Sequence, residues 1–192
     1  GELTGYRGVS RDITQRRLSE KELHKLSSVV QQNPNTIIIT NLDGIMEYVN
    51  PAGCETSGYA LAELLGQSPS VFASGNTPRQ TYKSLWATIK SGQKWEGIFH
   101  NRKKSGELFW ESALIVPIRD AEGVVSHYLG VKEDITKRIK FEDALKESEE
   151  RYRQLFEASP DAIILADIET GMLIDANPVA CSMLGYSLNK IR

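Results

Sequence analysis

The alternation of hydrophobic and polar residues divides the chain into helical and extended segments. Apolar side chains recur every three or four positions over 15–32, which predicts a helix that ends at the Asn33-Pro34 pair. The β-branched run Thr36–Thr40, a polar turn at 41–44 and an alternating segment at 45–49 together predict a β-hairpin.

The segment that follows the hairpin is predicted to form helices and then longer strands. Short helices are predicted at Pro51–Ser57 and 60–64, and a longer helix begins after Thr77-Pro78, where proline suits the first turn. Four apolar residues form the inner face of that helix: Tyr82, Leu85, Trp86 and Ile89. Three segments rich in aromatic and β-branched residues predict strands at 94–103, 107–118 and 124–133. The pattern therefore predicts an α+β fold, a five-stranded antiparallel sheet with short helices on one face.

Two phrases of the sequence occur twice, about one domain length apart. "YVNPAGCETSGYALAEL" at 48–64 returns as "DANPVACSMLGYSLNKI" at 175–191, and "GVSRDITQR" at 8–16 returns as "GVKEDITKR" at 130–138. A period this long exceeds the roughly 20–50 residues of solenoid repeats, so it indicates tandem copies of a whole domain.

The positions of the two phrases predict how the copies are arranged. We expect residues 1–14 to end a preceding copy, 33–136 to form a complete copy, and 159–192 to begin a following one. Helical linkers are expected between them, at 15–32 and 137–158. The chain is accordingly expected to be a segment of a longer protein.

Composition and charge narrow the possible functions. The net charge of −2 comes from mixed signs, so no basic surface favours nucleic acid or an anionic membrane. No apolar stretch approaches the roughly 20 residues that span a bilayer. Cys54 and Cys181 hold equivalent places in successive copies, which predicts two buried residues in separate cores rather than a disulfide. Free thiols are compatible with a reducing cytoplasm.

The repeated phrases, the central helix and the three long strands resemble a known family, the PAS domains. This resemblance implies the PAS fold and a sensor module that precedes histidine kinases or cyclic-di-GMP enzymes. "NTPRQTYKSLW", "WEGIFHNRKKSGELFW" and "IVPIRDAEGVVSHYLGVKEDIT" are most similar to the flavin-binding PAS domains of the redox sensors NifL and MmoS. The resemblance implies that the complete copy binds FAD, with Trp86 and Asn101 beside the flavin ring.

The chemistry of Trp86 and Asn101 is consistent with these flavin-binding roles, and it is also consistent with simpler structural roles. Asn101 offers a donor and an acceptor from a rigid strand, and Trp86 offers a flat wall with an N–H group. In the plainer interpretation Trp86 is a core residue and Asn101 a surface polar residue before a turn. Ile38 and Pro69 stand where the flavin-binding subgroup has a serine and a glutamate. Two functions follow: a flavin redox sensor, or a cofactor-free PAS module for dimerisation and signal relay.

Other chemistries find less support in the sequence. The stretch at 68–78 has no cysteine of the kind that light-sensing LOV domains use. Haem is not favoured, since His24, His100 and His127 fall on the linker and on strands rather than on the long helix. The histidines and cysteines lack metal-ligand spacing, and no nucleotide-binding or kinase motif is present. We therefore expect a sensor region and not an enzyme, with any catalytic output domain beyond Arg192.

Both predicted linkers carry narrow apolar stripes. The first consists of Leu23, Leu26 and Val30, and the second of Phe141, Leu145, Tyr152 and Leu155. Their spacing of three and four residues matches the seam of a two-helix coiled coil. The sequence therefore predicts a parallel homodimer joined through these helices, with packing of the stripes onto the chain's own sheet as the alternative.

Overall fold

The computed structural model describes residues 14–185 and divides into two compact units, Gly1–Thr136 and Lys137–Arg192. The expected end of a preceding copy at 1–14 therefore lies, apart from Thr14, outside the described residues. The same holds for the last part of the following copy, 186–192.

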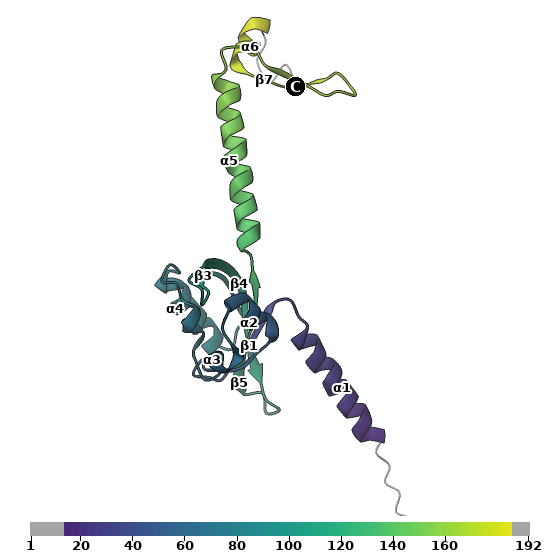
Figure 1. The fold of residues 1–192 in the computed structure, drawn as a ribbon, viewed down its shortest axis with the longest axis vertical. Coiled ribbons are helices and arrows are strands. Elements are labelled where there is room, and N and C mark those ends of the chain that lie inside the picture. Colours follow the sequence, from purple (N-terminus) through teal and green to yellow (C-terminus); the bar gives the residue numbers. More distant parts are fainter. Residues whose placement is uncertain (1–13, 186–192) are drawn as a thin grey trace, which may run out of the picture. The chain divides into compact units, whose positions relative to one another are not determined.

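The first unit contains one sheet with helices on one of its faces (Figure 1). Its elements are α1 (Thr14–Gln31), β1 (Thr36–Thr40), β2 (Met46–Val49), α2 (Pro51–Ser57), α3 (Leu61–Leu64), η1 (Pro69–Phe72), α4 (Arg79–Lys90), β3 (Trp95–Arg102), β4 (Leu108–Arg119) and β5 (Val125–Asp134). The strands pair in the order β2-β1-β5-β4-β3, and every pairing is antiparallel. The predicted α+β fold with a five-stranded antiparallel sheet is confirmed.

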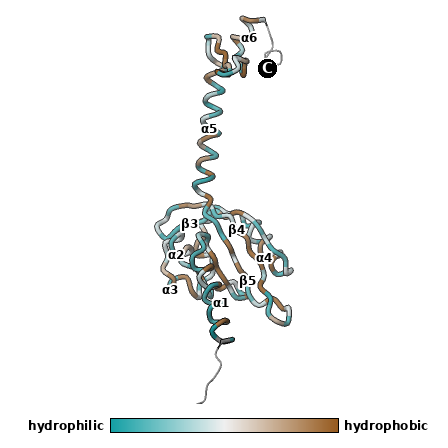
Figure 2. The backbone as a smooth tube through the Cα atoms, turned by 90° about the vertical axis from the view of Figure 1, so that its right-hand side faces the viewer, coloured by the Kyte–Doolittle hydropathy of each residue, from teal (hydrophilic) through white to brown (hydrophobic). Residues whose placement is uncertain are grey.

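Alternation along the strands separates an inner from an outer face of the sheet. On β5, Tyr128, Gly130 and Lys132 are buried and their neighbours are less so, as a period of two requires. The buried side chains form two apolar clusters. One joins α4 to β3, β4 and β5 and contains Leu85, Ile89, Trp95, Phe99, Ala113 and Tyr128. The other contains Ile38, Met46, Val49, Leu64 and Phe72, from β1, β2, α3 and η1. Figure 2 shows the hydrophobic residues along β4 and β5.

The repeated Asn-Pro phrase forms the same local structure in both copies. Asn50 caps α2 in extended backbone (φ −76°, ψ 166°), and its side chain accepts a hydrogen bond from the N–H of Gly53. Asn177 caps α6 (Pro178–Leu184) with φ −75° and ψ 167°, and accepts one from Ala180. Both helices end at a glycine in the left-handed region, Gly58 or Gly185, where a side chain would be strained. The repeated phrase therefore determines where this helix begins and where it ends.

The second unit contains α5 (Thr136–Ala158) except for its first residue, and also β6 (Ile164–Ala166), β7 (Leu173–Ala176) and α6. The last three elements repeat β1, β2 and α2 in order, with β6 and β7 paired antiparallel. Among the helices within residues 14–185, none combines the length and the apolar character that crossing a membrane requires.

The two cysteines differ from expectation in one respect. Both Cys54 and Cys181 are free thiols, but they are half-buried rather than fully buried. Each begins the last turn of a short helix, α2 or α6. Burial still raises the pKa of the Cys54 thiol, and the charge of Glu55 adds to this effect.

Candidate functional site

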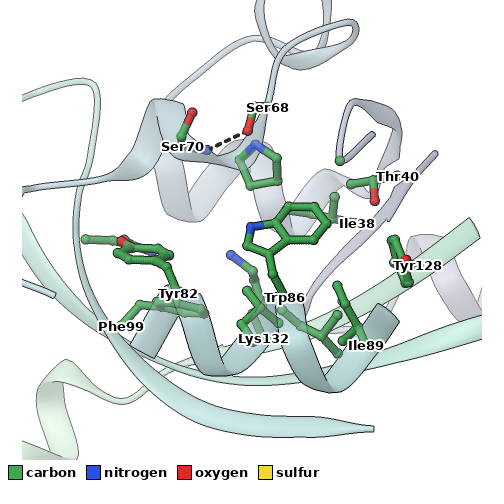
Figure 3. Close-up of a pocket in the computed structure, with 16 residues that line it drawn as sticks. Ile38, Thr40, Ser68, Ser70, Tyr82, Trp86, Ile89, Phe99, Tyr128 and Lys132 are labelled. Atoms are coloured by element: carbon green, nitrogen blue, oxygen red, sulfur yellow. Dashed lines mark hydrogen bonds between the residues drawn. The ribbon is translucent and has the colours of Figure 1, made fainter. Parts of the chain in front are cut away.

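A cavity of about 140 Å³ lies between α4 and the inner face of the sheet (Figure 3). This volume is roughly ten times the 10–15 Å³ that one buried water requires. Apolar side chains form most of its wall: Ile38, Pro69, Tyr82, Leu85, Trp86, Ile89, Phe99, Ile115 and Tyr128. Polar groups come from Thr40, Ser68, Ser70, Asn101 and Lys132, and glycines from Gly44 and Gly130. The cavity suits a flat, largely apolar ligand with a polar edge.

Trp86, one of the two residues implied by the resemblance, lines this cavity from α4. Its indole contacts Tyr128 edge to face, with ring centroids 6.2 Å apart. On another side it lies against Gly44, where an added Cβ would approach the Trp86 ring to 2.8 Å. Figure 3 shows the indole between Tyr82 and Ile38. Trp86 is therefore both a wall of the cavity and a packing residue, and the absence of a side chain at Gly44 makes room for it.

Asn101, the other residue, lines the same cavity from β3. It is only 4% exposed, so the interpretation of Asn101 as a surface residue is wrong. Its Nδ2 group donates to Oε2 of Glu111 over 3.0 Å, which orients the amide. The Oδ1 atom accepts no hydrogen bond from the part of the chain that the structure describes, and it remains available to a ligand.

Sequence reasoning missed the charged residues at this end of the cavity. Lys132 on β5 lines the cavity, and its Nζ atom lies 2.8 Å from Oε2 of Glu111 on β4. The alternation of buried residues could have identified both, because Lys132 follows Tyr128 and Gly130 on the inner face. The sequence analysis also gave no role to Gly130, which lies between Ile38 of β1 and Ile115 of β4 in the sheet register.

Ile38 and Pro69, the two positions at which the resemblance implied polar residues, both line the cavity. Pro69 opens η1, a helical turn in the stretch that the sequence analysis left without regular structure. Ser68 caps this turn by accepting a hydrogen bond from the N–H of Ser70 over 3.3 Å. The sheet contributes Thr40, Asn101 and Lys132 to the polar part of the cavity wall, and the η1 turn contributes Ser68 and Ser70.

The segment between η1 and α4 is fastened to the edge strand β3 beside Asn101. Ala73 forms an antiparallel bridge with Asn101. The N–H of His100 donates to Oγ1 of Thr77 over 2.9 Å, and Ser74 donates through its hydroxyl to the carbonyl of His100. The His100 ring stacks on Trp110 at 4.2 Å between centroids. These contacts hold the backbone of Asn101 in place.

Strand β5 leads from the cavity to the first residue of α5. The backbone of Trp110 on β4 is bonded to this junction twice: its carbonyl accepts from the N–H of Ile135 over 2.9 Å, and its N–H donates to Oγ1 of Thr136 over 2.8 Å. Asp134 accepts a hydrogen bond from the N–H of Thr136 over 2.9 Å at the start of the helix. Because Trp110 adjoins Glu111, the cavity's charged end and the junction share one stretch of β4.

Within residues 14–185, no group of three or more His, Cys, Asp or Glu side chains is placed to hold a metal ion. A single sheet that closes an apolar cavity together with α4, and leads directly into a helix, defines a small α+β binding domain. Two family models agree on a more specific assignment: a PAS-domain model matches residues 34–137, and a second PAS-domain model matches 150–192. The chain belongs to the PAS-domain family.

Relatives with established names include several signalling proteins. The chain is 30% identical to the nitrogen fixation regulatory protein of Klebsiella oxytoca over 148 residues, which covers 77% of this chain and 30% of that protein. It is 33% identical to the aerotaxis receptor of Escherichia coli over 93 residues, or 48% of this chain and 18% of the receptor. The chain thus spans less than a third of the length of either relative.

The fold also has counterparts among solved structures. An RNA-binding light-oxygen-voltage receptor superposes with a TM-score of 0.61 at 22% identity, over 69% of this chain and 39% of the receptor. A PAS domain from Colwellia psychrerythraea gives a TM-score of 0.56 at 22% identity, over 60% of this chain and 98% of that one. These likenesses support the PAS fold.

Proposed function

We propose that the sheet domain, residues 33–136, binds FAD non-covalently and acts as a redox sensor. The observation that carries this proposal is the cavity, because one apolar chamber brings together Trp86 from α4 and Asn101 from β3. An isoalloxazine ring requires apolar walls and a few polar groups at one edge. When bound, FAD supplies a centre that accepts and returns electrons reversibly.

Each residue has a physical reason for its proposed role. Asn101 directs Oδ1 toward the ligand, because its Nδ2 group is already bonded to Glu111. Trp86 provides a flat wall, and its indole N–H donates to no group within residues 14–185. Gly130 presents bare backbone, and a Cβ added there would meet its nearest protein atom, the carbonyl oxygen of Ile38, only at 3.8 Å. This leaves space at the floor of the cavity for a planar ring.

The proposed output of the sensor is a movement at the start of α5. Asn101 forms part of β3, which pairs with β4, and β4 holds the junction through Trp110. A change in the hydrogen bonds of Asn101 or Trp86 therefore shifts strands that are directly bonded to Ile135 and Thr136. Shifts of this kind are a known means of moving a helix at an interface.

An absorption spectrum of the purified chain, followed by heat release and chromatography of the ligand, tests the proposal. We expect flavin bands and released FAD. Asn101→Ala should weaken FAD binding by about 1–3 kcal/mol, the value of one buried hydrogen bond. Gly130→Leu should exclude FAD by filling the floor of the cavity, while circular dichroism shows a folded domain. Asn35→Ala is the matched control and should bind FAD like the parent, because Asn35 lies outside the cavity wall and its side chain forms no hydrogen bond within residues 14–185.

A colourless parent that takes up no FAD on reconstitution would refute the flavin proposal. Such a result would favour the second candidate function, a cofactor-free module for dimerisation and signal relay. The observation that favours this alternative is the apolar character of Ile38 and Pro69 in the cavity wall. Full FAD occupancy in both Asn101→Ala and Trp86→Ala would instead show that FAD binds elsewhere.

We also propose a parallel homodimer joined through α1 and α5. In α5 the side chains of Phe141, Leu145 and Leu155 are 74%, 61% and 69% exposed. In α1 the corresponding values for Leu23 and Leu26 are 66% and 59%. Most helical stability in proteins comes from packing of an apolar face, so burial of these stripes against a second copy would stabilise both helices.

Sedimentation at micromolar concentration tests the dimer. The parent should sediment as a dimer, and Leu26→Glu and Leu145→Glu should shift it toward monomer, because each buries a charge in the seam. Ser27→Glu and Gln154→Glu add the same charge to exposed positions outside the stripes and serve as matched controls. A monomeric parent, or Leu variants that dimerise as well as their controls, would contradict the seam.

The proposed organisation of the full protein follows the repeat. We propose that α1 and α5 are linkers between successive PAS domains at 1–14, 33–136 and 159–192, and that a kinase or cyclic-di-GMP enzyme follows as the output domain. The greater length of the nitrogen fixation regulatory protein and the aerotaxis receptor supports further domains. The free thiols of Cys54 and Cys181 support a location in the reducing cytoplasm.

A further inference from the structure

The polar end of the cavity contains a buried ion pair. Nζ of Lys132 lies 2.8 Å from Oε2 of Glu111, and the two side chains are 7% and 4% exposed. Transferring two charges from water to this depth costs several kcal/mol per ion before their attraction is counted. A well-packed apolar pair of similar volume is often as stable as a buried ion pair, so this pair is weak evidence for stability alone.

Lys132 and Glu111 differ in their position relative to the cavity. Lys132 forms part of its wall, as Asn101 does, whereas Glu111 lies behind them and is absent from the wall. The same Oε2 atom of Glu111 accepts from both, over 2.8 Å from Lys132 and 3.0 Å from Asn101. Glu111 therefore holds two cavity-lining donors in position and stays one side chain farther from any ligand than Lys132.

The ammonium group of Lys132 has unused capacity to bind a ligand. It carries three N–H donors, and Glu111 is its acceptor among the described side chains. Its other close neighbours are aromatic rings: Nζ lies 5.6 Å from the centroid of Phe72 and 5.5 Å from that of Phe99. Rings attract a cation but accept no conventional hydrogen bond, so the donors that Glu111 leaves free are open to an acceptor in the cavity.

We infer that Lys132 is a ligand-binding residue that selects the anionic state of the ligand, and that Glu111 opposes this preference while positioning Lys132. The inference rests on the proposed binding of FAD. Two electrons and one proton convert the neutral oxidised isoalloxazine ring of FAD into its anionic reduced form, so the ring gains one negative charge. Lys132 attracts this charge and Glu111 repels it. Because Lys132 is closer to the cavity, attraction exceeds repulsion, and the parent binds the reduced form more tightly than it would without the pair.

The two residues should therefore have opposite effects on the redox equilibrium of bound FAD. Lys132→Met keeps the length of the side chain without its charge, and should lower the ratio of reduced to oxidised affinity at least tenfold. Glu111→Gln keeps the hydrogen-bonding shape without its charge, and should raise the ratio at least tenfold. For a two-electron couple, tenfold corresponds to a shift of about 30 mV in midpoint potential, downward for Lys132→Met and upward for Glu111→Gln. If the pair had a purely structural role, both variants would change the stability of the domain, but they would not shift the midpoint potential in opposite directions.

The experiment is a dithionite titration of the FAD-loaded chain against reference dyes, in parent and variants. Single variants leave one buried charge unpaired, which is strongly destabilising, so the double variant Lys132→Met/Glu111→Gln provides a folded alternative with no buried charge. Its ratio should fall below the parent's, because the loss of the nearer charge, that of Lys132, outweighs the loss of the farther one, that of Glu111. The matched control is Lys94→Met, which removes one exposed charge of a surface pair and should leave the potential unchanged.

Each outcome separates this inference from the proposed function. A parent that binds no FAD overturns both. A parent that binds FAD, with single variants that shift in the same direction or do not shift, overturns the role of Lys132 and leaves the flavin proposal standing. If the single variants do not fold, a double variant with the parent's potential overturns it equally.

Discussion

Asn50 allows the sharpest prediction about what holds the domain together. Its side chain is fully buried and forms five hydrogen bonds. Oδ1 accepts from the N–H groups of Ile37 and Gly53, over 2.8 and 3.1 Å. Nδ2 donates to the carbonyl oxygens of Val30, Asn33 and Asn35, over 3.2, 3.3 and 2.9 Å. One amide thus joins the end of α1, strand β1 and the start of α2.

Asn50→Ala removes the acceptor of two N–H groups and the donor to three carbonyl groups. Each buried N–H left unsatisfied costs about 1–3 kcal/mol, and loss of a helix N-cap typically costs about 1 kcal/mol. The carbonyl oxygens lose less, since each can accept a second bond. The Gly53 N–H keeps a second acceptor, the backbone carbonyl oxygen of residue 50 at 3.0 Å, so only the cap value applies there. Together with the unsatisfied N–H of Ile37, this gives an expected loss of about 2–4 kcal/mol, a large part of the 5–15 kcal/mol typical of a domain.

Urea unfolding followed by circular dichroism measures this loss as a lower midpoint at unchanged slope. Asn35→Ala is the control, because its side chain forms no hydrogen bond within the described residues, and it should stay within about 0.5 kcal/mol of the parent. Asn50→Asp keeps the acceptor but turns an oxygen toward three carbonyl oxygens, so it should also destabilise more than the control. A loss below 1 kcal/mol for Asn50→Ala would refute the reasoning.

Two further predictions concern the cavity wall and the surface. Gly44→Ala and Gly66→Ala both place a side chain at φ +78°, but only Gly44 faces Trp86, so Gly44→Ala should destabilise more and shift the indole N–H signal of Trp86 in NMR spectra. Equal losses and an unmoved signal would contradict the contact. Lys104, which donates to both carboxylate oxygens of Glu63 over 2.7 Å, holds the pKa of Glu63 below its ordinary value. The stabilisation is present above the unfolded-state pKa of Glu63 and is lost as the pH falls through its folded-state pKa. Glu63→Gln should therefore reduce the acid sensitivity of the urea midpoint, and an unchanged pH profile would count against this pair.

Much of the fold could be predicted because its signals are local. Thr36–Thr40 and Pro51–Ser57 match β1 and α2 residue for residue. Residues close by in the sequence determine where each element begins and ends. For β1 this is the run of β-branched residues, and for α2 it is the asparagine cap together with the closing glycine. The turn η1 was missed, because its order depends on the Ser68 cap and on the anchoring of the next residues to β3.

The candidate site was predicted only in part. Trp86 and Asn101 were named from the resemblance, and the structure brings both to one cavity. Lys132 and Glu111 were overlooked because a charged residue on a strand normally faces solvent. What buries them is their pairing across β4 and β5, a contact between positions far apart in sequence. Alternation could have placed each on the inner face, but only the three-dimensional register brings the two charges together.

Because the backbone of Trp110 is hydrogen-bonded to both Ile135 and Thr136, a small tilt at the start of α5 produces a larger displacement at its far end. A helix of 23 residues is about 34 Å long at 1.5 Å per residue. Because its first residue is fixed to β4, a tilt of about 5° at that root displaces the far end by about 3 Å, which is more than half the rise of one helical turn. Under the proposed relay, strand movements too small to disturb the packing of the sheet would therefore be amplified along the helix in proportion to its length. Deleting whole heptads from α5 would keep its apolar stripe on the same face of the helix. It would also reduce the displacement of the far end in proportion to the length removed.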